Sequence, residues 1–244
     1  MTKQKRENKG FSIETLRRVA RGLRAGIKYY TALLNAGEKL AAIISDGNEK
    51  IGHVINVSLA PILTCGNCKA CIRFCYAIRD IYSHGYDFIK HAVMRARCIN
   101  TALFWYDRDA FFKQIADYIE SLPESVPHLF RWHVAGEIVD YDHFDRLVKF
   151  ALAHSNWYFW SYTKMHTIVN VWIDKNGSLP DNFCMMFSWW DNETIYNPHN
   201  LPVFHSVPAE KISGEKWTCP GNCDECKPGK RGCIGKESVE CAIH

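Results

Sequence analysis

The sequence predicts an α/β protein built around a parallel β-sheet, arranged as a partial (β/α) barrel or as an open sheet. Segments rich in β-branched and aromatic residues alternate with segments of helical periodicity, and this alternation favours parallel strands joined by right-handed crossovers. The hydrophobic fraction of 47% in 244 residues is enough for one substantial core. Helices are expected before the barrel, and a cysteine-rich tail follows it.

Residues 1–50 are expected to form an N-terminal helical segment. Ser12 is placed to cap a helix that begins at Ile13, and apolar residues then recur at helical spacing. A second helical piece is expected around residues 32–45, with Gly37 as its weak point. The other face of the first helix is either solvated or a contact for nucleic acid, because it carries Arg17, Arg18, Arg21 and Arg24.

Residues 51–210 are predicted to form the partial barrel. The expected strands are residues 53–59, 129–134, 157–162, 183–189 and 202–207. The expected helices are residues 71–104 with a break at His84-Gly85, residues 108–121, residues 166–173, and a segment whose apolar face is Phe144, Leu147, Val148, Ala151 and Leu152. The carboxyl ends of parallel strands gather functional groups, so a site is expected there.

A cysteine loop follows the first predicted strand. Cys65, Cys68, Cys71 and Cys75 have the spacing C-x2-C-x2-C-x3-C, which is that of a bacterial ferredoxin cluster loop. Thiolates are soft ligands that suit iron–sulfur clusters, zinc or cuprous ion. No signal peptide and no membrane-length apolar run is evident, so the clustered cysteines indicate metal in a reducing cytoplasm rather than disulfides.

Residues 211–244 are predicted to be a metal-binding tail. The segment is rich in glycine, lysine and cysteine and has too few apolar residues to order itself. Metal ligation would order it, because the free energy of binding then contributes to folding. The expected ligands are Cys219, Cys223, Cys226 and Cys233, and a further cysteine follows at Cys241.

The identity and number of the metal centres stay open at this point. Each cysteine group could hold one [4Fe-4S] cluster, Cys75 could cross to the tail, or one cluster could be shared by loop and tail. Zinc is the alternative, because Cys65-x2-Cys68 and Cys223-x2-Cys226 are acceptable zinc-ribbon halves.

Three polar residues near the ends of predicted strands are candidates for catalysis: His133, Glu137 and Lys164. Each has a structural alternative. His133 fits a hydrogen-bonded core histidine, Glu137 a residue at a helix start, and Lys164 a solvated charge. Asp191 and His205 end later strands.

The cysteine loop and the pair Gly136-Glu137 resemble features of the radical S-adenosylmethionine superfamily, over roughly residues 53–207. In that superfamily a C-x3-C-x2-C loop after strand one holds three irons of a cubane, and the fourth iron binds the methionine part of S-adenosylmethionine. The resemblance implies that Gly136 and Glu137 meet the amino group of this cofactor and that Phe74 is the aromatic residue before the last ligand. The spacing among Cys68, Cys71 and Cys75 is inverted relative to that motif.

Three other segments are similar to an uncharacterised family of tailed-phage proteins: Cys75-Tyr76-Ala77, residues 131–137 and Tyr162-Thr163-Lys164. This resemblance spans much of the chain. It implies a phage-encoded protein that acts in the host cytoplasm, and it brings no activity with it.

Three hypotheses for function follow. The first is a redox or radical enzyme built on an iron–sulfur barrel. The second is a non-catalytic iron–sulfur protein that carries electrons to a redox partner or senses redox state. The third is a zinc-stabilised module that binds nucleic acid through the arginine face, which the net charge of +4 permits but does not itself indicate.

Overall fold

Strands form at all of the five predicted positions, and the tail adds two more. The computed structural model describes residues 10–47, 51–66, 68, 71–190, 194–226 and 231–242. Within these residues a seven-stranded sheet has the order β1-β2-β3-β4-β5-β7-β6. Its strands are β1 (Ile55–Val57), β2 (Leu129–Trp132), β3 (Tyr158–Thr163), β4 (Phe183–Trp190), β5 (Val203–Val207), β6 (Trp217–Thr218) and β7 (Val239–Ala242).

All neighbouring strands in the sheet are parallel. The parallel α/β class is therefore confirmed. β1 and β6 lie at the two ends of the described strand order, so the described strands form an open sheet. The tail, which the sequence predicts not to order by itself, joins the sheet, because β7 pairs with β5 and β6 pairs with β7.

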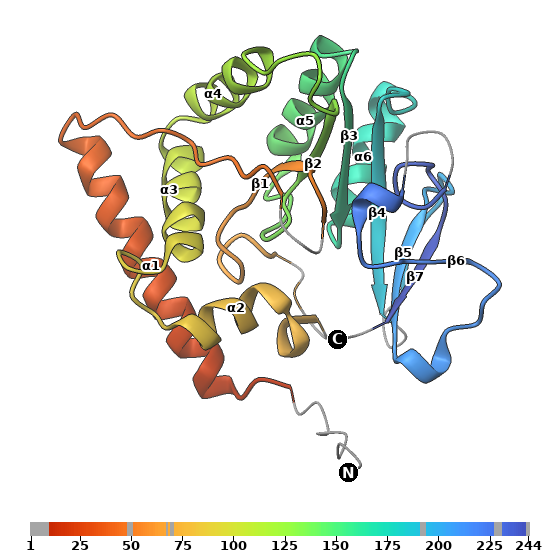
Figure 1. Ribbon diagram of the computed structural model, residues 1–244, viewed down its shortest axis with the longest axis horizontal. Helices are drawn as coiled ribbons and strands as arrows, with labels where there is room; N and C mark the ends of the chain where they lie inside the picture. The colour runs from red at the N-terminus through yellow and green to blue at the C-terminus, as the bar shows by residue number, and fades with distance from the viewer. Residues whose placement is uncertain are drawn as a thin grey trace.

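Six α-helices accompany the sheet in the described part of the chain (Figure 1). They are α1 (Ile13–Asn35), α2 (Tyr76–His84), α3 (Ala92–Tyr106), α4 (Arg108–Glu120), α5 (Tyr141–Ala153) and α6 (His166–Asn176). Short 3-10 turns cover Cys71–Phe74, Ala209–Lys211 and Cys223–Glu225. The predicted break at Gly85 is confirmed, since α2 ends there. None of the described helices is long and apolar enough to cross a membrane.

The N-terminal helix differs from the prediction at its carboxyl end. The side chain of Ser12 accepts a hydrogen bond from Thr15 N, which confirms the cap, but α1 then continues without a break to Asn35. Gly37 takes φ 86°, and the amides of Gly37 and Glu38 donate to the carbonyls of Leu34 and Leu33. This pairing is a Schellman motif, and it ends the helix. The second helix expected over residues 32–45 is therefore wrong.

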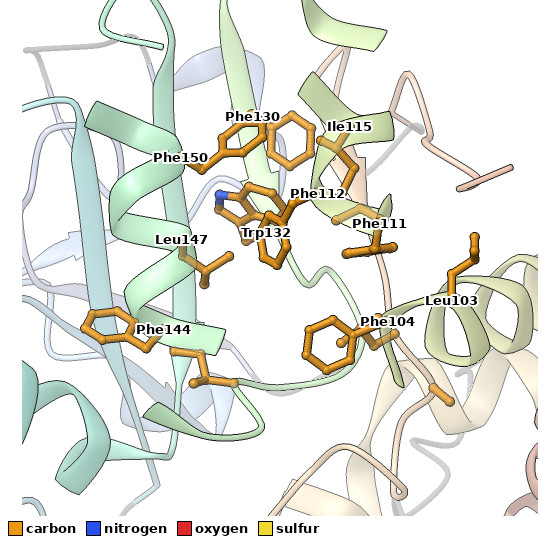
Figure 2. Close-up of a cluster of buried hydrophobic side chains, with 14 of the residues drawn as sticks. Leu103, Phe104, Phe111, Phe112, Ile115, Phe130, Trp132, Phe144, Leu147 and Phe150 are labelled. Atoms are coloured by element: carbon orange, nitrogen blue, oxygen red, sulfur yellow. The ribbon is translucent and has the colours of Figure 1, made fainter. Parts of the chain in front are cut away.

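The larger core lies between the sheet and the helices. Side chains alternate across a strand, so Phe130 and Trp132 of β2 point to this core and Arg131 points to the other face. Figure 2 shows rings from β2, α3, α4 and α5 gathered here: Phe104, Phe111, Phe112, Phe130, Trp132, Phe144 and Phe150. Each fully buried ring stabilises the fold by roughly 1.5–3 kcal/mol. Leu152, expected on the apolar face of α5, is instead 61% exposed.

The smaller core lies on the opposite face of the sheet and is built with the tail. Trp160 of β3 and Cys184 and Met186 of β4 are buried there. The tail supplies its covering side chains, namely Cys226, Cys233, Ile234 and Val239. The tail is thus part of the hydrophobic architecture of the sheet.

Candidate metal centre

The cysteine loop begins on a backbone fixed to the end of β2. Leu59 N donates to Ala135 O at 2.8 Å, and Ala135 N donates to Ser58 Oγ at 3.1 Å. Thr64 Oγ1 donates to Ala60 O at 2.8 Å and closes the turn before Cys65. The loop therefore leaves the carboxyl end of β1, at the edge where parallel sheets gather functional groups.

The four loop thiols are neighbours, although among the described residues no three of their Sγ atoms lie within 4.8 Å of one another. The Sγ atoms of Cys68 and Cys71 lie 3.4 Å apart. Hydrogen bonding to Cys65, then to Cys71, raises the pKa of Cys68, and burial adds to the effect. Burial raises the pKa of Cys75 to about 11, and the charges of Cys65 and Cys71 act in the same direction. Any metal that bound here would therefore release protons from the thiols.

Gly136 brings the end of β2 into contact with this loop. Its φ is 94°, and a Cβ at this position would lie 2.7 Å from Leu59 Cβ and 3.0 Å from Thr64 Oγ1. Glycine alone adopts this conformation without strain and leaves this space. On the other side, a Cβ on Gly66 would lie 3.1 Å from Cε of Met165, just after β3.

We expect Gly136→Ala to destabilise the fold and to displace the cysteine loop. The left-handed backbone costs about 1–2 kcal/mol for a residue with a Cβ, and the contact with Leu59 adds a steric term. Chemical denaturation should show a lower free energy of unfolding. Gly177→Ala is the matched control, because Gly177 also has a positive φ but nothing lies within 4 Å of its added Cβ. Equal destabilisation by both substitutions would mean that the contact with the loop is unimportant.

Glu137 ties the ends of β2 and β3 together. Its Oε1 accepts from Thr163 Oγ1 at 2.7 Å and from Ile138 N at 2.8 Å, and its Oε2 accepts from Lys164 N at 2.9 Å. Burial raises the pKa of Glu137, while these hydrogen bonds and the Lys164 charge lower it. A carboxylate has about four acceptor sites, so one is left for an additional donor such as a ligand amine.

Lys164 is buried, so the alternative interpretation of this residue as a solvated charge is wrong. Its side chain is at the carboxyl end of β3, with Nζ 3.4 Å from Ser188 O and 6.0 Å from the ring centroid of Trp190. The Trp190 ring stacks on Phe74 of the cysteine loop, with centroids 6.0 Å apart. Phe74, Glu137 and Lys164, predicted separately, are thus linked through contacts at one edge of the sheet.

His133 lies in the larger core, as its structural alternative expects. Its Nε2 is 3.1 Å from Nε2 of His143 on α5, and both side chains are buried. Val139 N donates to Nδ1 of His143, so His143 carries its proton on Nε2 and donates it to His133. Burial lowers the pKa of His133 to about 3. His205 is buried and stacks on Trp189, while Asp191 lies outside the described residues.

The tail thiols gather on the other face of the sheet. A hydrogen bond with Cys241 lowers the pKa of Cys219 to about 6, with help from the Gly221 amide and the Arg131 charge. Cys233 Sγ lies 3.0 Å from the Tyr162 hydroxyl. Cys226 interacts with Trp217, Cys219 and Cys223. All four predicted ligands are therefore in this group, and Cys241, which was not among them, belongs to it as well.

Arg131 is a site residue that sequence reasoning missed. Its guanidinium lies over the Tyr162 ring, 4.6 Å from the centroid. Burial opposes its charge, but Tyr162, Tyr76, Cys223 and Cys233 raise its pKa, so the cation is retained. A fixed cation beside thiolates offsets their negative charge. The available signal was an arginine within a short strand whose other residues are apolar.

The donor sets fit a soft metal or a cluster. The loop holds four neighbouring thiols, and the tail holds five, of which four interact with the charge of the half-buried Arg131 on β2. Loop ligands would be Cys65, Cys68, Cys71 and Cys75, and tail ligands would come from Cys219, Cys223, Cys226, Cys233 and Cys241. Thiolates at these positions satisfy the ligand preference of iron–sulfur clusters and of zinc.

Comparison with known proteins gives one family. No curated protein and no solved structure matches the chain. Residues 29–203 match the family described as gene product 88, a range that runs from within α1 to the start of β5 and includes the cysteine loop, Glu137 and Lys164. The match agrees with the predicted resemblance to a phage protein family, and the chain belongs to the gene product 88 family.

Proposed function

We propose that this chain is a phage-encoded iron–sulfur protein that performs redox or radical-type chemistry at the carboxyl edge of its sheet. The observation that carries the proposal is that Cys65, Cys68, Cys71 and Cys75 are neighbours in one loop after β1, with the Sγ atoms of Cys68 and Cys71 3.4 Å apart. Its spacing is that of a ferredoxin cluster loop, and its position is where parallel sheets hold reactive groups. The cytoplasm of the host is the compartment in which such thiols stay reduced.

A second cluster in the tail is part of the proposal. Four tail thiols, those of Cys219, Cys223, Cys233 and Cys241, interact with the half-buried Arg131, whose charge favours the thiolate form of its neighbours. A cluster ligated by thiolates carries net negative charge, and a nearby fixed cation stabilises its reduced form. Two clusters on one sheet would suit electron transfer to a redox partner.

Radical chemistry requires one iron without a cysteine ligand. Cys65, Cys71 and Cys75 would give a three-thiolate site, which leaves Cys68 as the thiol that is not required. S-adenosylmethionine bound at the open iron would supply the radical chemistry. Glu137 has one acceptor site for the amino group of the cofactor, and Phe74 with Trp190 offers a stacked aromatic surface.

Zinc is the second candidate, and one distance favours it. The Cys68 and Cys71 sulfurs are 3.4 Å apart, close to the roughly 3.8 Å that tetrahedral geometry gives for two thiolates at about 2.3 Å from one zinc ion. In a cubane the two thiolates are on different irons and lie farther apart. If zinc stabilises the chain, the nucleic-acid hypothesis is favoured. The contact with nucleic acid would then be the exposed Arg17, Arg21 and Arg24, which line a groove between α1 and Ile62.

We expect the protein purified without oxygen from iron-replete cells to be brown and to contain iron and acid-labile sulfide. Thiolate-to-iron charge transfer gives the colour. Metal and sulfide analysis together with the optical spectrum are the measurements. Stoichiometric zinc without iron or sulfide would refute the iron–sulfur proposal and support the zinc one.

Single cysteine variants test the ligand assignment in the same preparation. Cys71→Ala should lose the loop cluster, whereas Cys68→Ala should keep it if a three-thiolate site exists. Cys98→Ala is the control, because Cys98 is buried against α1 and belongs to neither group. If Cys68→Ala also loses the cluster, and S-adenosylmethionine leaves the electron paramagnetic resonance spectrum of the reduced protein unchanged, the radical proposal fails while the iron–sulfur proposal stands.

A further inference from the structure

A second kind of ligand cluster lies at the junction of α2 and α3. One ring nitrogen each of His84 and His91 and one carboxylate oxygen of Asp80 all lie within 4.8 Å of one another. Asp80 and His84 are four residues apart on α2, so they share one face of that helix. His91 is the N-cap residue of α3, and its ring stacks on His84 with centroids 5.3 Å apart.

The segment that joins the two helices is held in place by its own hydrogen bonds. Asp87 Oδ1 accepts from Ile89 N at 3.0 Å and from Lys90 N at 3.3 Å. His91 N donates to Asp87 O at 2.8 Å. His91 is therefore presented to α2 by a fixed turn, which makes the cluster preorganised.

Asp80 is oriented by a buried arginine. Arg97 Nη1 lies 3.3 Å from Asp80 Oδ2 and 3.1 Å from the Ala77 carbonyl. The other oxygen, Oδ1, lies 3.5 Å from Nδ1 of His84. Carboxylates that ligate metals commonly have such a hydrogen-bonded partner on the oxygen that does not bind. Arg97 balances the charge of Asp80, so the two imidazoles carry most of the affinity.

The histidines have lone pairs to offer. His91 Nδ1 is buried and has no hydrogen-bond partner among the described residues. A buried nitrogen without a partner favours binding of a ligand, because burying an unsatisfied polar atom costs free energy. Burial also lowers the pKa of His91, which the Asp80 charge opposes. The side chain of His84 is 63% exposed, which leaves room for water on a bound ion.

We propose that Asp80, His84 and His91 bind one divalent transition-metal ion, Zn²⁺ or Fe²⁺, that clamps the end of α2 to the start of α3. Two imidazoles and one carboxylate are the ligands these ions accept at sites with open positions. A modest closure of the three side chains would bring the donor atoms to ligand distances of about 2.0–2.2 Å. α2 follows Cys75 directly, so the clamp would also fix the helix that carries the last loop thiol.

Cobalt(II) distinguishes this site from the cysteine sites. The probe is Co²⁺ added to the intact protein with its cysteine centres filled as purified. We expect calorimetry to show one bound equivalent, with weak visible bands and without the intense charge-transfer band that thiolate ligands give. Loss of a residue that is hydrogen-bonded to a metal ligand lowers metal affinity roughly 10–100-fold. His84→Gln removes a ligand itself, so it should lower the affinity for Co²⁺ by at least that much.

The control is His199→Gln, which breaks another histidine–aspartate pair, His199 with Asp174 at 2.9 Å. It should bind Co²⁺ as the wild-type protein does. Because His84 is exposed, His84→Gln should fold normally, and circular dichroism with the iron or zinc content of the cysteine centres checks this. No Co²⁺ binding by the wild-type protein, equal binding by His84→Gln, or binding only with a thiolate band would overturn the proposal.

Discussion

Deleting residues 219–244 is expected to prevent stable folding. The deletion removes β7 and the buried side chains of Cys226, Cys233, Ile234 and Val239, which cover Trp160 and Met186. Each large apolar side chain that loses burial costs roughly 1.5–3 kcal/mol, and a domain has only about 5–15 kcal/mol of net stability. Thermal melting followed by circular dichroism should show no cooperative transition, or one at a much lower temperature.

A full-length variant separates packing from metal ligation. Cys219→Ser with Cys223→Ser keeps β7 and the buried apolar side chains but removes two tail thiols. It should lose metal from the tail and retain a cooperative transition. A truncated chain that melts at the wild-type temperature would show that the tail contributes nothing to the stability of the sheet.

The buried histidine pair should make the protein sensitive to acid. His133 and His143 are neutral in the folded state, because burial lowers the pKa of His133 to about 3 and that of His143 well below its usual value. In the unfolded chain both titrate near 6.5, so below that pH the unfolded state binds more protons. The free energy of unfolding should therefore fall as the pH decreases from about 6.5 toward 3, by up to about 1.4 kcal/mol per pH unit for each histidine.

His133→Asn tests this effect. Asparagine tolerates the positive φ of 55° at this position, so the backbone is preserved while one titrating ring is removed. The free energy of unfolding, measured with denaturant between pH 7 and 4.5, should depend less steeply on pH. The slope should fall by about half of the contribution of the histidine pair. His128→Asn, a change at a half-buried surface ring, should keep the wild-type slope. Protonation of the cysteine thiols affects all three proteins alike, so equal slopes would argue against the pair.

Much of the fold was predictable because its signals are local. The five central strands are runs of β-branched and aromatic residues, and the chain turns at Gly37 and Gly85, where positive φ values favour glycine. The tail strands were not predicted. β6 has only two residues, and β7 has one β-branched residue in four, so contact with β5 decides the pairing of β7, contact with β7 decides that of β6, and propensity decides neither.

The candidate site was likewise predictable only where its residues are close in sequence. Cys65 to Cys75 are close in sequence, so their spacing alone indicated a shared centre. Arg131 and Cys241 could not be assigned, because their relation to Cys219 exists only once β2 and the tail lie together. The same holds for Asp80 and His91, which come from two helices that meet across a turn.

The order of β6 and β7 in the sheet has a consequence for synthesis of the chain. β7 lies between β5 and β6, although β6 is made first. During translation β5 is therefore an open sheet edge, and β6 has no strand to pair with, until residues 239–242 have left the ribosome. Exposed edges of this kind invite pairing with other chains. Nascent protein should thus be most prone to aggregation before residues 239–242 emerge, and any metal centre in the tail would assemble after that step.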